Sequence, residues 1–184
     1  GGELVIMPEA LASVFSIHLN PDFPFRDETW IAVAFERNAY DNTRMPEWFF
    51  RVASHQFARS GAVGLLIQGD YFSEAGLSEV TVEPFEWSSY QEFMLRPEAY
   101  SLEYRMASSD LQCGVWADAD ITVFGGEPTL MTAVIDELGG ANVLLEHMRQ
   151  EFLLGDISGY QEMDEYFQRL LFPGLRKAGG ASAP

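Results

Sequence analysis

Asp118 and Asp120 form a pair of carboxylates whose spacing suits metal binding. Residues two apart in a strand or turn point the same way, so these two side chains could share a divalent cation through oxygen ligands. A turn between two strands also favours Asp, because its side chain accepts hydrogen bonds from nearby backbone amides. We favour the turn and predict no metal site, since the three histidines also lack a zinc-ligand spacing.

The histidines are candidates for acid–base chemistry only if the fold brings them to a reacting group. His18 falls on the polar side of a predicted strand, His55 borders the apolar side of a predicted helix, and His147 lies on a later helix. A general base must lie within hydrogen-bond reach of the proton that it removes. An enzyme or small-ligand site assembled from distant residues such as His18, His55 and Asp70 is therefore our alternative hypothesis.

Two further segments carry weak chemical signals. Cys113 falls on an apolar strand position without a basic neighbour, so we predict a buried structural thiol and not a nucleophile. Residues 124–128 (FGGEP) combine a strand end, a glycine turn and a helix start, an arrangement that can hold phosphate, but the carboxylate of Glu127 would repel it. No G-x-S-x-G motif occurs. We predict no cofactor and favour a non-enzymatic role.

Charge is the most informative property of the chain. With 28 acidic and 11 basic residues among 184, the formal net charge is -17. Such a charge repels polyphosphate backbones and anionic lipid, which argues against nucleic-acid or membrane-surface binding. Two long windows contain no Lys or Arg. The first, Ser60–Leu95, holds Asp70, Glu74, Glu79, Glu83, Glu86 and Glu92, and the second, Met106–Met148, holds Asp110, Asp118, Asp120, Glu127, Asp136, Glu137 and Glu146.

These windows lead to a partner hypothesis. Complementary charge speeds protein association, and aromatic residues inside an acidic rim suit an interface. We expect a binding protein that neutralises a basic protein, most specifically a bacterial immunity protein that inhibits a cognate toxin. A purely solubilising surface is the plainer alternative, and self-association through the apolar helical third is a further one. The partner-binding residues that we predict are Asp70, Glu74, Glu79, Glu83, Glu86, Trp87, Asp118 and Asp120.

The elements that must position these residues begin with strands. Apolar and polar residues alternate over Phe15–Asn20, and 29–35 (TWIAVAF) is apolar enough to predict a central strand covered on both faces. After a helix up to about Ser60, further strands are predicted at 62–68, 79–83 and 100–106, followed by 113–117 and 121–124. Turns of hairpin length between the later strands indicate a meander.

Helical spacing dominates the last third of the sequence. Apolar stripes predict helices over about 130–138 and 144–152, and a capping box from Ser158 to Gln161 predicts a final helix that ends before Pro173. The expected fold is therefore α+β, a single domain with a mainly antiparallel mixed sheet backed by helices and a helical C-terminal third.

The ends of the chain suggest location and extent. We predict one domain over residues 1–184, with flexible ends at about 1–10 and 176–184. No stretch approaches the roughly 20 consecutive apolar residues of a membrane helix, and a lone cysteine fits a reducing compartment, so we expect a cytoplasmic protein. The start Gly1-Gly2-Glu3 lacks a methionine, which leaves a removed signal peptide open.

Overall fold

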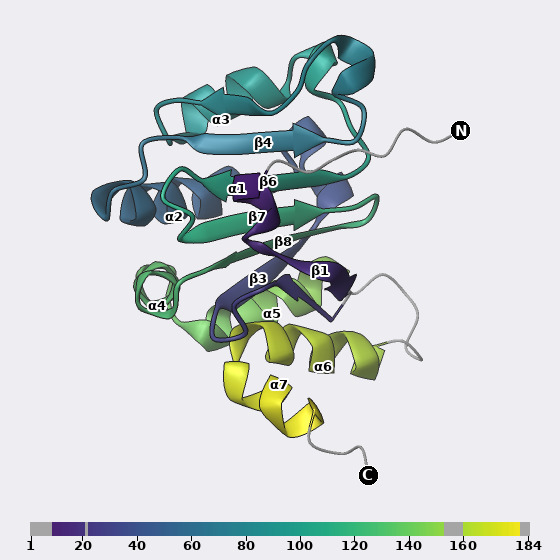
Figure 1. Ribbon diagram of the computed structural model, residues 1–184. Coiled ribbons are helices and arrows are strands. Elements are labelled where there is room, and N and C mark those ends of the chain that lie inside the picture. The colour runs from purple at the N-terminus through teal and green to yellow at the C-terminus, as the bar shows by residue number, and fades with distance from the viewer. Residues whose placement is uncertain (1–8, 21, 153–159, 181–184) are drawn as a thin grey trace.

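The computed structural model describes residues 9–20, 22–152 and 160–180 as a single α+β domain (Figure 1). Its centre is an antiparallel sheet of six strands in the order β3-β8-β7-β6-β4-β5, and a separate hairpin pairs β1 with β2. The strands are β1 (Phe15–Asn20), β2 (Phe23–Phe25), β3 (Ile31–Glu36), β4 (Leu65–Gly69), β5 (Val80–Val82), β6 (Tyr104–Ser108), β7 (Cys113–Ala117) and β8 (Ile121–Gly126).

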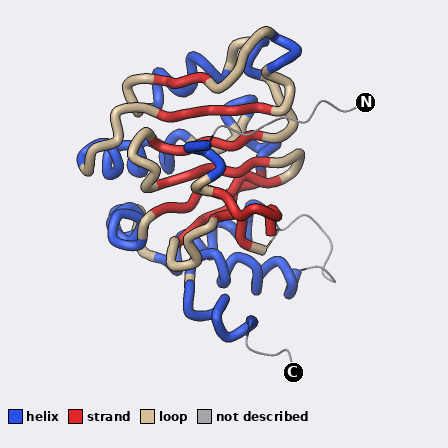
Figure 2. The backbone as a smooth tube through the Cα atoms, in the orientation of Figure 1, coloured by secondary structure: helices blue, strands red, loops and turns tan. Residues whose placement is uncertain are grey.

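The longer helices occupy one face and one edge of this sheet. Figure 2 shows the C-terminal helices below the sheet, beside β3, while α2 and α3 lie nearer its upper part. The α-helices are α1 (Glu9–Ala12), α2 (Glu47–Arg59), α3 (Trp87–Met94), α4 (Pro128–Glu137), α5 (Ala141–Phe152), α6 (Tyr160–Leu171) and α7 (Pro173–Gly180). Short 3₁₀ turns are η1 (Arg37–Ala39), η2 (Asp41–Thr43), η3 (Ser73–Ala75) and η4 (Pro97–Ala99).

Two neighbouring glycines of β8 identify what covers each face. A Cβ on Gly126 would meet Phe57 of α2 and Met131 of α4, whereas one on Gly125 would overlap the ring of Phe25 in β2. Successive strand residues point to opposite faces. Helices α2 and α4 therefore cover one face, and the β1–β2 hairpin lies against the other.

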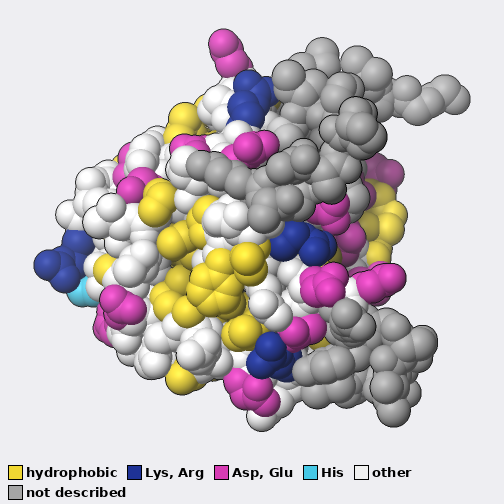
Figure 3. Space-filling model, turned by 90° about the horizontal axis from the view of Figure 1, so that it is seen from below, with side chains coloured by type: hydrophobic (Ala, Val, Ile, Leu, Met, Phe, Trp, Pro, Cys, Tyr) yellow, Lys and Arg dark blue, Asp and Glu magenta, His cyan; other side chains and the backbone are white. Residues whose placement is uncertain are grey.

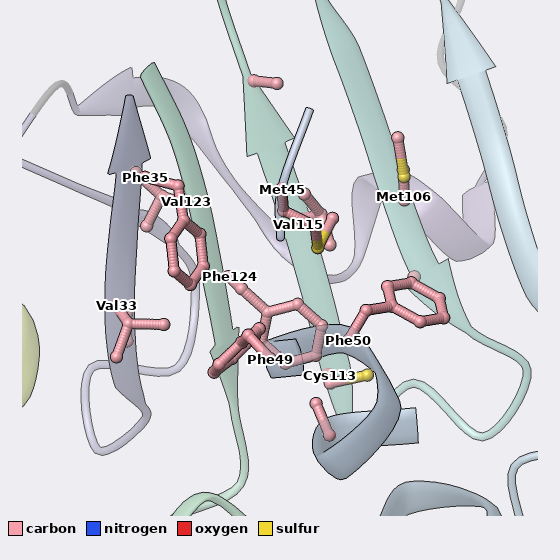
Figure 4. Close-up of a cluster of buried hydrophobic side chains, with 14 of the residues drawn as sticks. Val33, Phe35, Met45, Phe49, Phe50, Met106, Cys113, Val115, Val123 and Phe124 are labelled. Atoms are coloured by element: carbon pink, nitrogen blue, oxygen red, sulfur yellow. The ribbon is translucent and has the colours of Figure 1, made fainter. Parts of the chain in front are cut away.

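The main core forms where α2 meets the sheet. Phe49 and Phe50 point from the helix toward side chains of β6, β7 and β8 (Figure 4). The ring of Phe49 lies 4.9 Å from that of Phe35 and 5.1 Å from that of Phe124, and Phe50 stacks on Tyr90 at 4.4 Å. Burial of these aromatic rings is a large favourable contribution to folding, because each removes a large apolar area from water.

The fold class expected from the sequence is confirmed, and so are most individual elements. The strand at Phe15–Asn20 lies where predicted, α2 ends at Arg59, and β6, β7 and β8 form the meander. Strand β5 ends at Val82, close to the predicted end before Pro84. The capping box at 158–161 falls partly outside the described residues.

Three expectations about elements were wrong. Strand β3 is not central but lies at one end of the sheet, and its apolar sequence is explained by helices against its outer side. Residues 100–103 are not in a strand, because η4 and the turn after it precede β6. The last helix was expected to end before Pro173, and a further helix, α7, begins there.

Candidate partner-binding surface

Strand β5 supplies the centre of the candidate surface. Its alternating sequence, 79–83 (EVTVE), directs Val80 and Val82 toward the α3 side of the sheet, and Val82 is buried. Glu79, Thr81 and Glu83 therefore share the opposite face, where Thr81 and Glu83 are exposed and Glu79 is partly exposed. The period of two places both glutamates on the same side of this strand.

Four glutamates lie before and after this strand along the chain, and we call them the acidic edge: Glu74, Glu79, Glu83 and Glu86. Glu74 lies in η3 before β5, and Glu86 is the residue before the first turn of α3. Among the described residues none pairs with the carboxylates of Glu74, Glu79 or Glu83, whereas Ser88 donates a hydrogen bond of 3.2 Å to Glu86. The acidic edge is therefore a group of exposed or partly exposed carboxylates, and no cation of the described residues pairs with them.

The backbone of β5 is also open on its outer side. Gly64 accepts a hydrogen bond from the Ser109 amide, so the even-numbered residues of β4 bond to β6 and the odd-numbered residues bond to β5. Leu65 and Ile67 pair with Val82 and Val80, which leaves the amide and carbonyl of Thr81 directed away from the sheet. In the described part of the chain, no further strand pairs with this edge.

The opposite edge of the sheet, at β3, is covered by α5. The outward amide of Ala34 donates to the sulfur of Met148 at 3.3 Å, and the outward amide of Glu36 donates to a carboxylate oxygen of Glu151. Both acceptors come from α5. Unpaired strand edges invite pairing with other chains, and covering an edge with a helix prevents it. Helix α5 therefore covers the β3 edge of the sheet, whereas no strand of the described chain pairs with the outer side of β5.

Two of the predicted partner-binding acids stabilise turns at one end of the sheet. One carboxylate oxygen of Asp70 accepts hydrogen bonds from the amides of Leu102 and Glu103, at 3.0 and 3.1 Å. Asp118 likewise accepts from the amides of Asp120 and Ile121, at 2.8 and 2.9 Å. The spacing of Asp118 and Asp120 thus serves a turn.

Asp118 and Asp120 also lie far from the acidic edge in the sheet order. They occupy the β7–β8 connection, and β6 and β4 separate β7 from β5. Asp120 is exposed. Two acids of the first window, Glu79 and Glu83, thus flank β5, whereas those of the second are dispersed among hairpin turns and helices.

Trp87, another predicted contact residue, belongs to the core. It is 6% exposed and packs against Phe50 and Tyr90, with ring centroids 5.6 and 5.8 Å away. Its indole nitrogen is buried and has no hydrogen-bond partner in the described residues. Trp87 therefore packs the start of α3 against the core and offers little surface to a partner.

Two of the 11 basic side chains, Arg37 and Arg44, are buried, so their charges lie away from the carboxylates on the surface. Arg37 is 1% exposed and donates to the backbone carbonyls of Ser101, Leu102 and Asp118. Arg44 is also buried, and both guanidinium groups lie over the ring of Tyr104, at 5.6 and 5.4 Å. Burial lowers the pKa of Arg37, and the charge of Arg44 lowers it further. Sequence reasoning missed this pair, because nothing in the local pattern marks an arginine as buried.

Two residues of the alternative enzyme hypothesis, His55 and Asp70, lie toward opposite ends of β4. His55 is exposed on α2, whose C-terminal end leads into the start of β4, whereas Asp70 follows the end of that strand. The side chain of His18 falls outside the described residues. Cys113 is fully buried, and burial raises the pKa of its thiol to about 12.

A group of contacting side chains around His147, which the sequence analysis missed, lies beside β3. His147 lies 2.7 Å from a carboxylate oxygen of Glu151, which also accepts a hydrogen bond from the Tyr40 hydroxyl. The ring of Trp48 meets that of His147 edge to face at 4.9 Å. Burial, with the hydrogen bond to Glu151 second, raises the pKa of Tyr40. The i,i+4 spacing of His147 and Glu151 was the available signal.

An open hollow adjoins this cluster. Its volume is about 460 Å³, and its lining comes from α5, including Val143, Glu146 and His147. The carboxylate of Glu151 is nearly buried and already accepts from three donors, so its evident role is to hold α5 against β3. No nucleophile contacts His147 among the described residues.

The helical side of the molecule carries exposed apolar residues. Seen from below, hydrophobic side chains gather near the centre of this face (Figure 3). Val143 on α5, Phe172 after α6 and Leu175 on α7 are between 36% and 52% exposed. Self-association through this side stays a prediction.

Within residues 9–20, 22–152 and 160–180 the structure holds neither a cluster suited to a metal ion nor a helix suited to crossing a membrane. No group of three or more His, Cys, Asp or Glu side chains is arranged to hold a metal ion. In the same ranges no helix combines the length and apolar character needed to cross a membrane. No protein-family model, curated protein or solved structure matches the chain.

Proposed function

We propose that this protein is a non-enzymatic binding protein that neutralises a basic protein partner, and that the acidic edge is its contact surface. The observation that carries this proposal is the unpaired outer edge of β5 beside Glu79 and Glu83, which like Glu74 have no internal partner in the described structure. Residues Ser60–Leu95 contain no Lys or Arg that could offset them.

Electrostatics explains what such a surface would do. A concentrated negative potential attracts a cationic protein and orients it before contact. Carboxylates can then occupy positions on the partner that are built to receive phosphate. An immunity protein that inhibits a toxin acting on a polyphosphate is one specific form of this function. It is a narrower proposal, and its support is the charge of the surface alone.

The test is co-purification with a charge-reversed edge. Tagged wild-type protein and the double variant Glu79→Lys, Glu83→Lys are incubated with a lysate of the source organism at low and high salt. We expect the wild type to retain one stoichiometric basic protein, which high salt releases. The variant should retain none of it.

A matched control separates the edge from overall charge. Asp136→Lys with Glu162→Lys makes the same change in net charge at exposed residues of α4 and α6. This control should bind the partner as the wild type does. Equal loss in both double variants, or absence of any salt-sensitive basic partner, would refute the proposal.

A further inference from the structure

We propose that the partner contributes an extended segment that adds to β5 as a further antiparallel strand, with Lys or Arg facing Glu79 and Glu83. This inference rests on the proposed function and specifies how the acidic edge recognises its partner. The bound segment would have its two basic residues four positions apart, with a small or β-branched residue midway between them.

The backbone of β5 sets the register of this segment. Because Val80 and Val82 bond to β4, the amide and carbonyl of Thr81 face outward together. An antiparallel strand can exchange two hydrogen bonds with Thr81, one as donor and one as acceptor. Such backbone pairing provides affinity in β-strand addition, and the side chains provide specificity.

The side chains of β5 then determine the chemistry of the segment. Residues of the added strand that lie two positions before and after the one facing Thr81 would face Glu83 and Glu79. Directly opposite residues in an antiparallel pair have Cβ atoms about 5 Å apart, close enough for oppositely charged side chains to interact. Like charges at these positions are destabilising, so acidic segments are disfavoured.

The contrast between the two sheet edges supports this assignment. At β3 the outward amides of Ala34 and Glu36 are occupied by Met148 and Glu151. At β5 no helix of the described chain supplies an acceptor to Thr81, although α3 lies near the strand. The two glutamates also discourage pairing between two copies of this edge, because each would meet another carboxylate.

The experiment uses three synthetic peptides and the full chain. The first peptide is Ac-Thr-Arg-Val-Thr-Val-Arg-Thr-NH2, whose arginines are four residues apart. The second, Ac-Thr-Val-Arg-Thr-Arg-Val-Thr-NH2, has the same composition and charge, but only one of its arginines can face a glutamate at a time. The third replaces both arginines of the first with glutamates. Binding is measured by calorimetry, and amide protection by hydrogen exchange.

We expect the first peptide to bind about threefold more tightly than the second, since one more cross-strand ion pair forms. The third should not bind the wild type. Binding of the first should slow hydrogen exchange at the Thr81 amide. Equal affinity for the first two peptides would overturn strand addition, and so would unchanged exchange at Thr81 or no binding of the first at about 1 mM.

Variants of β5 test the backbone and the charges separately. Thr81→Pro removes the outward amide at an edge position where proline is tolerated, and it should weaken the first peptide about tenfold. Thr81→Val keeps that amide and the branched side chain, so it should bind as the wild type does. The charge-reversed edge should lose the first peptide and gain the third. Thermal unfolding of each variant confirms that it is folded.

The failure of this inference can be told apart from failure of the proposed function. If the partner from the lysate is lost with Glu79→Lys, Glu83→Lys but kept by folded Thr81→Pro, the acidic edge binds without strand addition. The proposed function then stands and this inference falls. If no basic partner depends on the acidic edge, the proposed function itself falls, whatever the peptides do.

Discussion

At the scale of single residues, the structure divides the acids into those that hold the fold and those that face outward. Asp70 accepts hydrogen bonds from two backbone amides, while Glu74, four residues later, has no partner in the described chain. We predict that Asp70→Ala lowers the free energy of unfolding by about 1 kcal/mol, because the amides of Leu102 and Glu103 lose their acceptor. Denaturant unfolding measures this, and Glu74→Ala should leave stability unchanged within about 0.5 kcal/mol.

The thiol of Cys113 gives a second prediction at this scale. Its pKa is raised to about 12 by burial, so the thiolate is scarce at pH 8 and the sulfur is also inaccessible. A maleimide reagent should therefore leave the folded protein unmodified at pH 8 and label it rapidly in denaturant. Labelling of the folded protein within minutes would contradict the buried placement, and mass spectrometry distinguishes the two results.

At the scale of elements, Glu151 connects α5 to the edge of β3. It accepts from the Glu36 amide and the Tyr40 hydroxyl and lies 2.7 Å from His147. We predict that Glu151→Ala lowers the free energy of unfolding by about 2 kcal/mol, since buried donors lose their acceptor. Hydrogen exchange at the Glu36 amide should become faster. Glu146→Ala, on the exposed side of the same helix, is the control and should change neither quantity appreciably.

Elements were predictable from the sequence where their signal is local. The alternation at Phe15–Asn20 and 79–83 and the apolar stripes of α4 and α5 depend only on nearby residues, and all of them formed. The position of β3 at the edge could not be read from its sequence, because a strand sealed by α5 is as apolar as a central one. Alternation at 100–103 was misleading, because the Asp70 carboxylate binds the turn there.

At the scale of the whole molecule, the net charge of -17 was evident from composition, but its distribution required the fold. The sequence predicted Glu79 and Glu83 as contact residues, but it could not show that β5 would be an open edge. It also could not separate Asp70, whose carboxylate accepts hydrogen bonds from the amides of Leu102 and Glu103, from acids that face outward. This pairing joins residues that are 32 and 33 positions apart, so composition and periodicity do not predict it.

The same distribution gives a prediction about association kinetics. If the acidic edge attracts its partner, raising the ionic strength from about 0.05 M to about 0.5 M should slow association about tenfold, because screening shortens the range of the field. Dissociation should change much less, since contacts within the complex are partly shielded from salt. Surface plasmon resonance with the captured partner measures both rates.

The two charge-reversal variants decide whether this steering comes from one surface. Any weak association that Glu79→Lys with Glu83→Lys still shows in this assay should lack most of the salt dependence, because the variant reverses the potential where the partner arrives. Asp136→Lys with Glu162→Lys should retain most of it, although both variants carry the same net charge. If the two variants lose salt dependence equally, the partner responds to the overall charge of the molecule, and the acidic edge has no special role in guiding it.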